Sequence, residues 1–318
     1  MRIAFAGTPP FAATALQALI SAGHEITLVL TQPDRPSGRG LKLKASPVKE
    51  VALAHGIPVL SPLTLSVKKS PEEAQTALAA LEATESDVLI VAAYGLILPM
   101  RALEAAKGIG VNKDIKSINL HASILPRWRG AAPIQRAIQS GDAETGVTLM
   151  KMELGLDTGP MIELVTTPIT EDDTAETLTT RLSQLGADAI VDALTRADRL
   201  TYTAQPEEGV VYAEKILKSE SPVNWNASAD EVCRCIRAFN PFPSATAQRN
   251  GETFKIWFAR VCDGKGAPGE VLCSKKKLVI ACGDKAIECT RLQKAGKPAM
   301  DVGPFLQSFP ISEGEILA

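Results

Sequence analysis

The sequence predicts an α/β protein in two parts, a larger domain built on a doubly wound, mostly parallel sheet and a smaller domain of short strands. Three observations lead to this prediction. The chain has 318 residues, enough for one large and one small domain. Apolar runs alternate with helical patterns in its first half. Beyond residue 209 the apolar runs become short and closely spaced.

The first half supplies the elements of the larger domain. The strands are expected at 2–6, 26–31, 87–93, 117–121, 147–152 and 161–168, and the helices at 11–22, 47–55, 71–83 and 132–139. In an open sheet of this kind, ligands bind beyond the carboxyl ends of the strands, at a switch in strand order. We therefore expect the chemistry of this protein at strand ends.

One long helix is expected at 171–196, with Asp173 as N-cap and Glu176 completing a capping box. Its leucines and alanines form one broad apolar stripe. The polar, proline-containing run 200–209 (LTYTAQPEEG) that follows is typical of a linker. These features divide the chain into a catalytic domain at 1–199 and a second domain at 210–318.

The second domain is predicted to contain one helix at 225–239 and short strands at 254–261, 269–273, 277–282 and 286–292. This spacing fits a small β-barrel, such as the five-stranded barrel of the oligonucleotide-binding (OB) type. All six cysteines lie here without any C-x-x-C pair, and no histidine follows His121. We therefore expect reduced thiols that act as small core residues, and no zinc site.

Several protein classes are disfavoured. No apolar run approaches the ~20 residues that span a bilayer, and the first residues show no signal-peptide pattern, so we expect a cytoplasmic protein without a membrane partner. The first strand ends in G-T-P-P, which lacks the glycine pattern of dinucleotide-binding proteins, and the chain has no phosphate-binding P-loop. A nicotinamide dehydrogenase or a P-loop ATPase is thus not expected.

The most informative stretch begins at the strand 117–121. Asn119 and His121 are two residues apart, so their side chains project from the same face. Asparagine offers a neutral N–H donor and histidine exchanges protons near neutral pH, so the pair could stabilise an oxyanion and handle a proton. The alternative is a pair of satisfied polar residues that close a buried strand.

A second polar element is G-L-D-T-G at 155–159, between two expected strands. A carboxylate between glycines on a tight loop can approach a ligand and orient a histidine, which makes Asp157 a candidate partner of His121. The alternative is an ordinary Asx-type turn.

A basic loop lies between residues 31 and 49, where five Lys or Arg side chains accompany one acid, Asp34. The net charge of the chain is only −2, which disfavours a protein dominated by non-specific nucleic-acid binding. The local charge is compatible with a phosphate-bearing partner, or with a solvated loop.

These stretches together carry a family resemblance. F-A-G-T-P at 5–9, Q-P-D-R-P-S-G-R-G at 32–40, A-A-Y-G-L-I-L-P at 92–99, N-L-H-A-S-I-L-P-R-W-R-G-A-A-P-I-Q-R-A at 119–137, G-L-D-T-G at 155–159 and I-R-A-F-N-P-F-P at 236–243 resemble the motifs of methionyl-tRNA formyltransferases, in the same order. The chain departs from the family pattern at Ala122 and Ile124, and the stretch 108–116 is several residues longer, which predicts a larger surface loop.

The resemblance implies a Rossmann-like catalytic domain, a tRNA-binding C-terminal domain, and transfer of a formyl group from 10-formyltetrahydrofolate to the amino group of methionyl initiator tRNA. It implies that Asn119 and His121 stabilise the oxyanion while Asp157 orients His121 and helps to pass a proton. It places the reduced folate against Ser123, Ile124, Leu125 and Pro126, and the tRNA against Arg39, Lys42 and Lys44. No metal is expected, and a monomer is the default.

Two other functions remain open. A folate-dependent formyltransferase acting on another amine, such as an amino sugar nucleotide, would keep Asn119, His121 and Asp157 but would have no reason for the Arg39 loop. A catalytically silent RNA-binding protein on the same scaffold would have no reason to keep those three residues.

Overall fold

The computed structural model describes residues 1–37 and 42–318, and the chain divides into two compact units. Unit 1 consists of Met1–Gly130, Thr145–Thr167 and Thr179–Tyr212, and unit 2 of Ala131–Glu144, Pro168–Leu178 and Ala213–Ala318. Each unit is therefore assembled from more than one segment of the chain. Residues 200–209, which we expected to link two domains, belong to unit 1.

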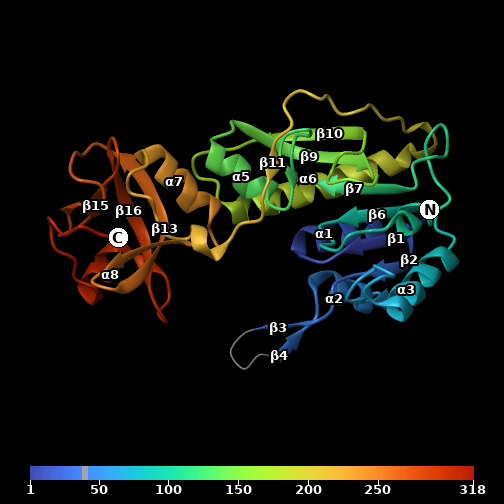
Figure 1. Ribbon diagram of the computed structural model, residues 1–318, viewed down its shortest axis with the longest axis horizontal. Coiled ribbons are helices and arrows are strands. Elements are labelled where there is room, and N and C mark those ends of the chain that lie inside the picture. The colour runs from blue at the N-terminus through green and yellow to red at the C-terminus, as the bar shows by residue number, and fades with distance from the viewer. Residues whose placement is uncertain (38–41) are drawn as a thin grey trace. The chain divides into compact units, whose positions relative to one another are not determined.

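Unit 1 is built on a seven-stranded sheet in the order β10-β9-β7-β6-β1-β2-β5 (Figure 1). Its strands are β1 (Arg2–Gly7), β2 (Glu25–Leu30), β5 (Val59–Leu60), β6 (Val88–Ala92), β7 (Ser117–His121), β9 (Glu144–Lys151) and β10 (Met161–Pro168). The pairs from β5 to β7 are parallel, and β9 runs antiparallel to β7. The predicted open, mostly parallel sheet is confirmed, and its strand order switches at β1, with β2 and β5 on one side and β6 and β7 on the other.

Helices cover both faces of this sheet. The helices of the first half are α1 (Pro10–Ser21), α2 (Pro47–Ala54), α3 (Pro71–Ala83) and α4 (Met100–Leu103). Ala4 and Leu89 pack in one core cluster with residues of α3 and α4. Alternate residues of β1 point to the opposite face, where α1 approaches so closely that a Cβ atom on Gly7 would lie 2.6 Å from the Cβ of Ala12. Glycine at position 7 permits this approach.

The long helix α6 (Ala175–Thr195) begins later than predicted. The Thr174 hydroxyl accepts a hydrogen bond from the Thr177 backbone N–H (3.2 Å), so Thr174 is the N-cap in place of Asp173. The Asp173 carboxylate instead binds the backbone N–H of Thr170 (2.8 Å) and the hydroxyl of Thr177 (3.2 Å). Asp173 therefore closes the turn before the helix, and the expected capping box is shifted by one residue.

Unit 2 contains a curled antiparallel sheet in the order β12-β13-β16-β15-β14, with β17 also paired to β16. Its strands are β12 (Ala245–Arg249), β13 (Glu252–Cys262), β14 (Val271–Cys273), β15 (Leu278–Ala281), β16 (Ala286–Lys294) and β17 (Met300–Asp301). Residues 314–318 bind both edges of this sheet: the Val271 N–H of β14 donates to the Glu315 carbonyl (2.8 Å), and the Ala318 N–H donates to the Gln248 carbonyl of β12 (3.0 Å). The open side of the curled sheet is thereby bridged.

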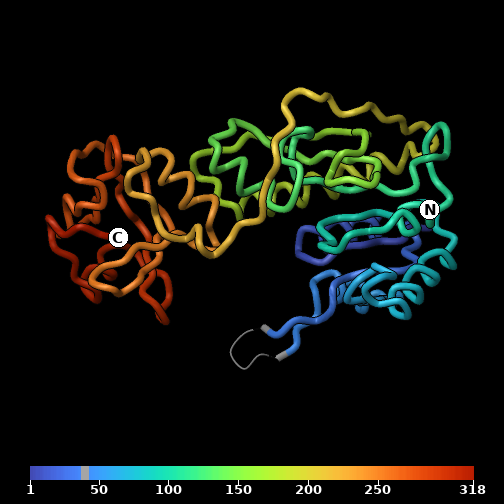
Figure 2. The backbone as a smooth tube through the Cα atoms, in the orientation of Figure 1, coloured from blue at the N-terminus to red at the C-terminus, as the bar shows by residue number. Residues whose placement is uncertain are grey.

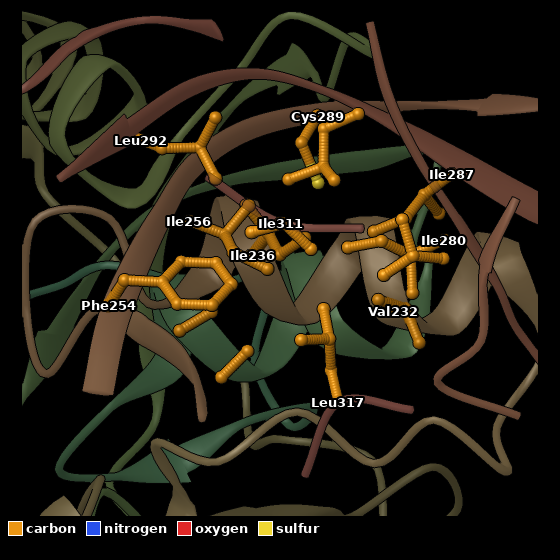
Figure 3. Close-up of a cluster of buried hydrophobic side chains, with 14 of the residues drawn as sticks. Val232, Ile236, Phe254, Ile256, Ile280, Ile287, Cys289, Leu292, Ile311 and Leu317 are labelled. Carbon is orange, nitrogen blue, oxygen red and sulfur yellow. The ribbon is translucent and has the colours of Figure 1, made fainter. Parts of the chain in front are cut away.

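The core of unit 2 lies between this sheet and its helices α7 (Ala229–Ala238) and α8 (Val302–Ser308) (Figure 3). Three tilted phenylalanine rings contact one another here, with centroids 5.4 to 5.6 Å apart: Phe254 of β13, Phe305 of α8 and Phe309 directly after α8. Helix α5 (Pro133–Ser140) packs against α7. The prediction that α7 starts at Trp225 was wrong, because Ser228 and Glu231 form a capping box that begins the helix, and Trp225 is a buried core residue before it.

All six cysteines are free thiols in unit 2. Cys233, Cys282 and Cys289 are buried in the core cluster, in keeping with their expected role as small core residues. Burial raises the pKa of the Cys233 and Cys282 thiols to about 12 and raises that of Cys289 well above its ordinary value. These thiols are therefore protonated at neutral pH.

The extended segment 200–212, yellow in Figure 2, runs from the end of the short 3₁₀ helix η1 (Ala197–Arg199) to β11 (Tyr212–Ala213). The Tyr202 hydroxyl donates to the Asp114 carboxylate (2.6 Å), which also binds Lys151 Nζ (2.6 Å). Asp114 belongs to the long stretch 108–116, which folds back on itself through an Ile109–Ile115 bridge. Within the described residues, no helix is long and apolar enough to cross a membrane.

Candidate active site

Asn119 and His121 lie on β7, between the parallel neighbour β6 and the antiparallel neighbour β9. Their side chains share one face, as the two-residue spacing predicted. Both residues are buried, with 9% and 5% of their surface exposed. Buried polar side chains need partners, so their hydrogen bonds determine what they can do.

The imidazole of His121 is held on both sides. Its Nε2 lies 2.8 Å from the carbonyl oxygen of Trp128, and its Nδ1 lies 3.6 Å from Oδ2 of Asp157. Because a carbonyl can only accept, Nε2 carries a proton and donates it to Trp128. In the neutral ring, Nδ1 is then the proton acceptor that faces the carboxylate.

Asp157 reaches this point from the loop between β9 and β10. Its carboxylate accepts a hydrogen bond from the Gly130 backbone N–H (2.8 Å) and a longer one from Asn119 Nδ2 (3.4 Å). Asp157 itself has a positive φ of 53°, in the left-handed region. Asparagine and aspartate tolerate this region better than other non-glycine residues. The structure thus brings Asn119, His121 and Asp157 together, as the sequence predicted.

The loop that carries Asp157 is closed at a narrow base, here called the neck, where Lys151 lies against Gly159 and Pro160. The Lys151 N–H donates to the Pro160 carbonyl (2.9 Å), which closes the loop at its base. A Cβ atom on Gly159 would lie only 1.9 Å from the Lys151 carbonyl oxygen. Glycine at 159 is therefore required for the two chains of the neck to pass each other.

Residues 123–126 form the turn that leaves β7. Ser123 is fully buried, and its hydroxyl donates to the Arg127 carbonyl (2.7 Å). The Thr148 hydroxyl of β9 donates to the Ser123 carbonyl (2.7 Å) and accepts from the Leu125 N–H (3.2 Å). Leu125 is buried, whereas Ile124 and Pro126 are half-buried. The contact of these four residues with folate stays a prediction.

The expected basic loop is a hairpin of β3 (Arg35–Ser37) and β4 (Lys42–Lys44), which extends below α2 in Figure 1. At its base, Lys49 Nζ binds both carboxylate oxygens of Asp34 at 2.9 Å. Lys44 is exposed on β4, which also contains Lys42. Arg39 lies outside the described residues, so its role as a tRNA contact stays a prediction.

The site also contains groups that sequence reasoning missed. The backbone of Trp128 and Gly130 binds His121 and Asp157 directly, and the Gln205 side chain binds the loop that carries Asp157. Backbone donors and acceptors have no signature in side-chain patterns. Gln205 lies in the polar run 200–209, whose composition is typical of a linker.

No cluster of three or more His, Cys, Asp or Glu side chains with a geometry suited to a metal ion occurs in residues 1–37 and 42–318. The side chains gathered at this site offer an amide donor, an imidazole and a carboxylate. They are grouped at the carboxyl end of β7, the edge of the parallel strands at which open α/β sheets bind ligands.

Comparisons with known proteins identify the family of this chain. A family model described as formyl transferase matches residues 1–194, and a model described as formyl transferase, C-terminal domain, matches residues 215–310. The methionyl-tRNA formyltransferase of Aromatoleum aromaticum is 50% identical to this chain over 318 residues, which cover 99% of this chain and 96% of the relative. The methionyl-tRNA formyltransferase of Delftia acidovorans is 50% identical over 326 residues, which cover 100% of this chain and 97% of the relative.

A solved structure shows the same fold. The N-formyltransferase from Helicobacter canadensis, in complex with folinic acid and dTDP-3-aminofucose, superimposes with a TM-score of 0.64 at 18% identity, over 92% of this chain and 98% of the other. Because the sequence relatives match at 50% identity over nearly the whole length of both chains, the chain belongs to the formyl transferase family and, within it, to the methionyl-tRNA formyltransferases.

Proposed function

We propose that this protein transfers the formyl group of 10-formyltetrahydrofolate to the α-amino group of methionine on initiator tRNA. The observation that carries the proposal is the convergence of three side chains in a chain of this family: Asn119 Nδ2 and His121 Nδ1 lie 3.4 and 3.6 Å from the Asp157 carboxylate. In the reaction, the bond between the formyl carbon and N10 of the folate breaks and an amide bond to the methionine nitrogen forms. One proton must leave the amine and reach N10.

Asn119 supplies the donor for the formyl oxygen. Among the described residues, its side chain bonds only to Asp157, at 3.4 Å, which occupies one N–H of the carboxamide and leaves the second N–H for a ligand. Negative charge develops on the formyl oxygen as the amine adds, and a fixed donor in a buried site stabilises that charge. Removing one donor of this kind typically costs ~10²–10³ in rate.

His121 and Asp157 handle the proton. The Trp128 carbonyl holds the Nε2 proton of His121, so a proton released by the attacking amine enters between Nδ1 and the Asp157 carboxylate, 3.6 Å apart. The imidazolium formed in this way is stabilised by the carboxylate and can donate from Nδ1 to the formyl oxygen or, through water, to the departing nitrogen. The α-amino group has a pKa of ~7.7–8.0, so part of it is already neutral at pH 7.

The residues around the site fit a flat, partly apolar co-substrate. Leu154 and Leu156, in the loop that carries Asp157, are 63% and 58% exposed, and Ile97, which follows the neighbouring strand β6, is 90% exposed. Exposed apolar side chains beside convergent polar groups are typical of a ligand site. We assign the reduced folate to these residues and to the 123–126 turn. The bound folate supplies the activated formyl group.

We assign tRNA binding to the basic hairpin, with Arg39, Lys42 and Lys44, and to unit 2. The curled sheet of unit 2, bridged by residues 314–318, supports its assignment as a barrel of the OB type, an architecture that binds oligonucleotides. We further propose that the protein acts as a monomer in the cytoplasm, where initiator tRNA is used.

The test mixes purified protein with 10-formyltetrahydrofolate and methionyl initiator tRNA and follows formyl-methionine. Asn119→Ala should lower kcat by ~10²–10³. Asn112 is an exposed asparagine in the 108–116 loop, so Asn112→Ala should leave kcat unchanged. Uncharged tRNA is the blank, and an amino sugar nucleotide is offered as a competing acceptor. Formylation of the sugar without formylation of methionyl-tRNA would move the acceptor to another class of molecule.

A further inference from the structure

Gln205 makes four hydrogen bonds inside unit 1. Its Nε2 donates to the carbonyl oxygens of Asp157 (2.8 Å) and Gly159 (2.7 Å). Its Oε1 accepts from Arg129 Nε (3.0 Å) and Nη2 (2.7 Å). Carbonyls only accept and a guanidinium only donates, so the orientation of the carboxamide is fixed by its partners.

We propose that Gln205 is a positioning residue for Asp157. The inference rests on the proposed function, in which the Asp157 carboxylate shares a proton with His121. Gln205 holds the backbone of the loop that carries Asp157. Through Arg129 it also holds the adjoining Gly130, whose N–H binds the Asp157 carboxylate at 2.8 Å. One side chain thus fixes both the residue and the donor that orients it.

The loop needs such support because Asp157 occupies the left-handed region at φ 53°. Non-glycine residues persist in sparsely populated conformations only where surrounding contacts hold them. The carboxylate is also weakly held on its other side, where the contacts with Asn119 and His121 are 3.4 and 3.6 Å long. The short bonds to Gly130 and Gln205 therefore determine where the carboxylate lies.

The segment that carries Gln205 is itself fixed on both sides. Thr203 exchanges two backbone hydrogen bonds with Met161 (2.9 and 2.8 Å), and the Arg129 N–H donates to the Val211 carbonyl (2.9 Å). Between these points Gln205 is half-buried, while residues 201–204 and 206–209 are exposed. Gln205 is thus the inward-facing residue of this stretch, and an exposed neighbour such as Glu207 provides a matched control.

Two variants separate the donor and acceptor roles of the carboxamide. Gln205→Ala removes both. Gln205→Glu keeps the side-chain length and an acceptor for Arg129, but places an oxygen against the two loop carbonyls. Displacement of a catalytic group by ~1 Å can cost 10²-fold in rate. Both variants should therefore lower kcat by about 10²-fold, with little change in the KM for 10-formyltetrahydrofolate or the KM for methionyl-tRNA. Glu207→Ala should retain wild-type kcat.

A double-mutant cycle distinguishes positioning from general destabilisation. If Gln205 acts through Asp157, adding Gln205→Ala to Asp157→Asn should cause almost no further loss of kcat, because the group being positioned has already been removed. A residue that only stabilises the fold would give losses that multiply in the double variant. Multiplying losses would therefore overturn the proposal.

A second readout does not depend on activity. In a ¹⁵N-labelled protein, the Gly130 amide proton reports its hydrogen bond to the Asp157 carboxylate. Its resonance should move upfield in Gln205→Ala and in Asp157→Asn, and should stay in place in Glu207→Ala. An unmoved Gly130 resonance in Gln205→Ala would also overturn the proposal. If that resonance moves as expected but the wild-type protein formylates no methionyl-tRNA, the proposed function fails and the positioning role stands.

Discussion

Gly159→Ala tests whether the position of the Asp157 loop controls the rate. The added Cβ would lie 1.9 Å from the Lys151 carbonyl oxygen, where real Cβ atoms essentially never approach closer than 3.0 Å. One side of the neck must therefore move by about 1 Å, because the atom that the Cβ would meet is a backbone oxygen that cannot rotate away. The Asp157 loop, closed at this neck by the Lys151–Pro160 hydrogen bond, is displaced with it.

The expected effect on catalysis is larger than the effect on stability. A shift of ~1 Å in a catalytic group corresponds to about a 10²-fold loss of kcat. Overpacking costs about 1–3 kcal/mol of unfolding free energy, which lowers the melting temperature by some degrees but leaves the protein folded. Formyl transfer at saturating substrates and thermal unfolding, measured on the same preparation, separate the two effects.

Gly303→Ala is the matched control, because no atom lies within 4 Å of its added Cβ and the residue is in helix α8. It should have wild-type kcat. If Gly159→Ala is destabilised yet retains kcat within about twofold of wild type, the neck can relax without moving Asp157. The position of the Asp157 loop would then not control kcat, and the prediction would be refuted.

Three further predictions concern unit 2 and the hairpin. Phe254→Ala should lower the unfolding free energy by ~3–5 kcal/mol in urea titrations, and a loss below ~1 kcal/mol would contradict the core assignment. The hydrogen bond from Arg249 lowers the pKa of Glu315 to about 2 from 4.5. The stabilisation that this pair gives the folded state is therefore complete above pH 4.5 and is lost as the pH falls toward 2. The melting temperature of wild type should thus fall more steeply over this acid range than that of Arg249→Gln, and parallel curves would contradict the coupling. Arg39→Ala should raise KM for methionyl-tRNA and reduce the slope of log affinity against log salt by about 1, with Lys44→Ala weaker in the same direction; an unchanged slope would count against phosphate contacts.

The sequence was most informative where backbone geometry alone sets the outcome. Strand alternation placed Asn119 and His121 on one face of β7, and glycines on both sides of Asp157 indicated a loop that can approach a ligand. Both rules act over a few residues and do not depend on the rest of the fold. The shared face of Asn119 and His121 and the tight loop of Asp157 were therefore predictable from local sequence, whereas the contact between His121 and Asp157 depends on the fold of unit 1.

Residues that act through distant contacts were not predictable in this way. Gln205 belongs to a polar stretch with a proline, and only the folded chain shows that its carboxamide reaches backbone carbonyls 46 and 48 positions away. The elements β12 (ATAQR) and α8 (VGPFLQS) were missed for a related reason. Strand β12 has few β-branched or aromatic residues, and α8 contains glycine and proline, so tertiary packing overrides weak local propensity in both.

Element ends were the other source of error. The helix expected from Trp225 begins after Ser228, because the Ser228–Glu231 capping box outweighs the apolar character of Trp225. Similarly, Thr174 takes the cap position that Asp173 was expected to hold. At α6 the adjacent residues Asp173 and Thr174 could both serve as the cap, and local sequence does not decide between them.

The placement of the thiols makes unit 1 a convenient host for a spectroscopic probe. Every cysteine of the chain lies between residues 233 and 289, so the unit that carries Asn119, His121 and Asp157 has none. Burial keeps the thiols of Cys233, Cys282 and Cys289 protonated, and protonated thiols react slowly with maleimides. A single cysteine introduced at exposed Glu207 would therefore take up a fluorophore ahead of these buried thiols, and its emission would follow segment 200–212 during turnover.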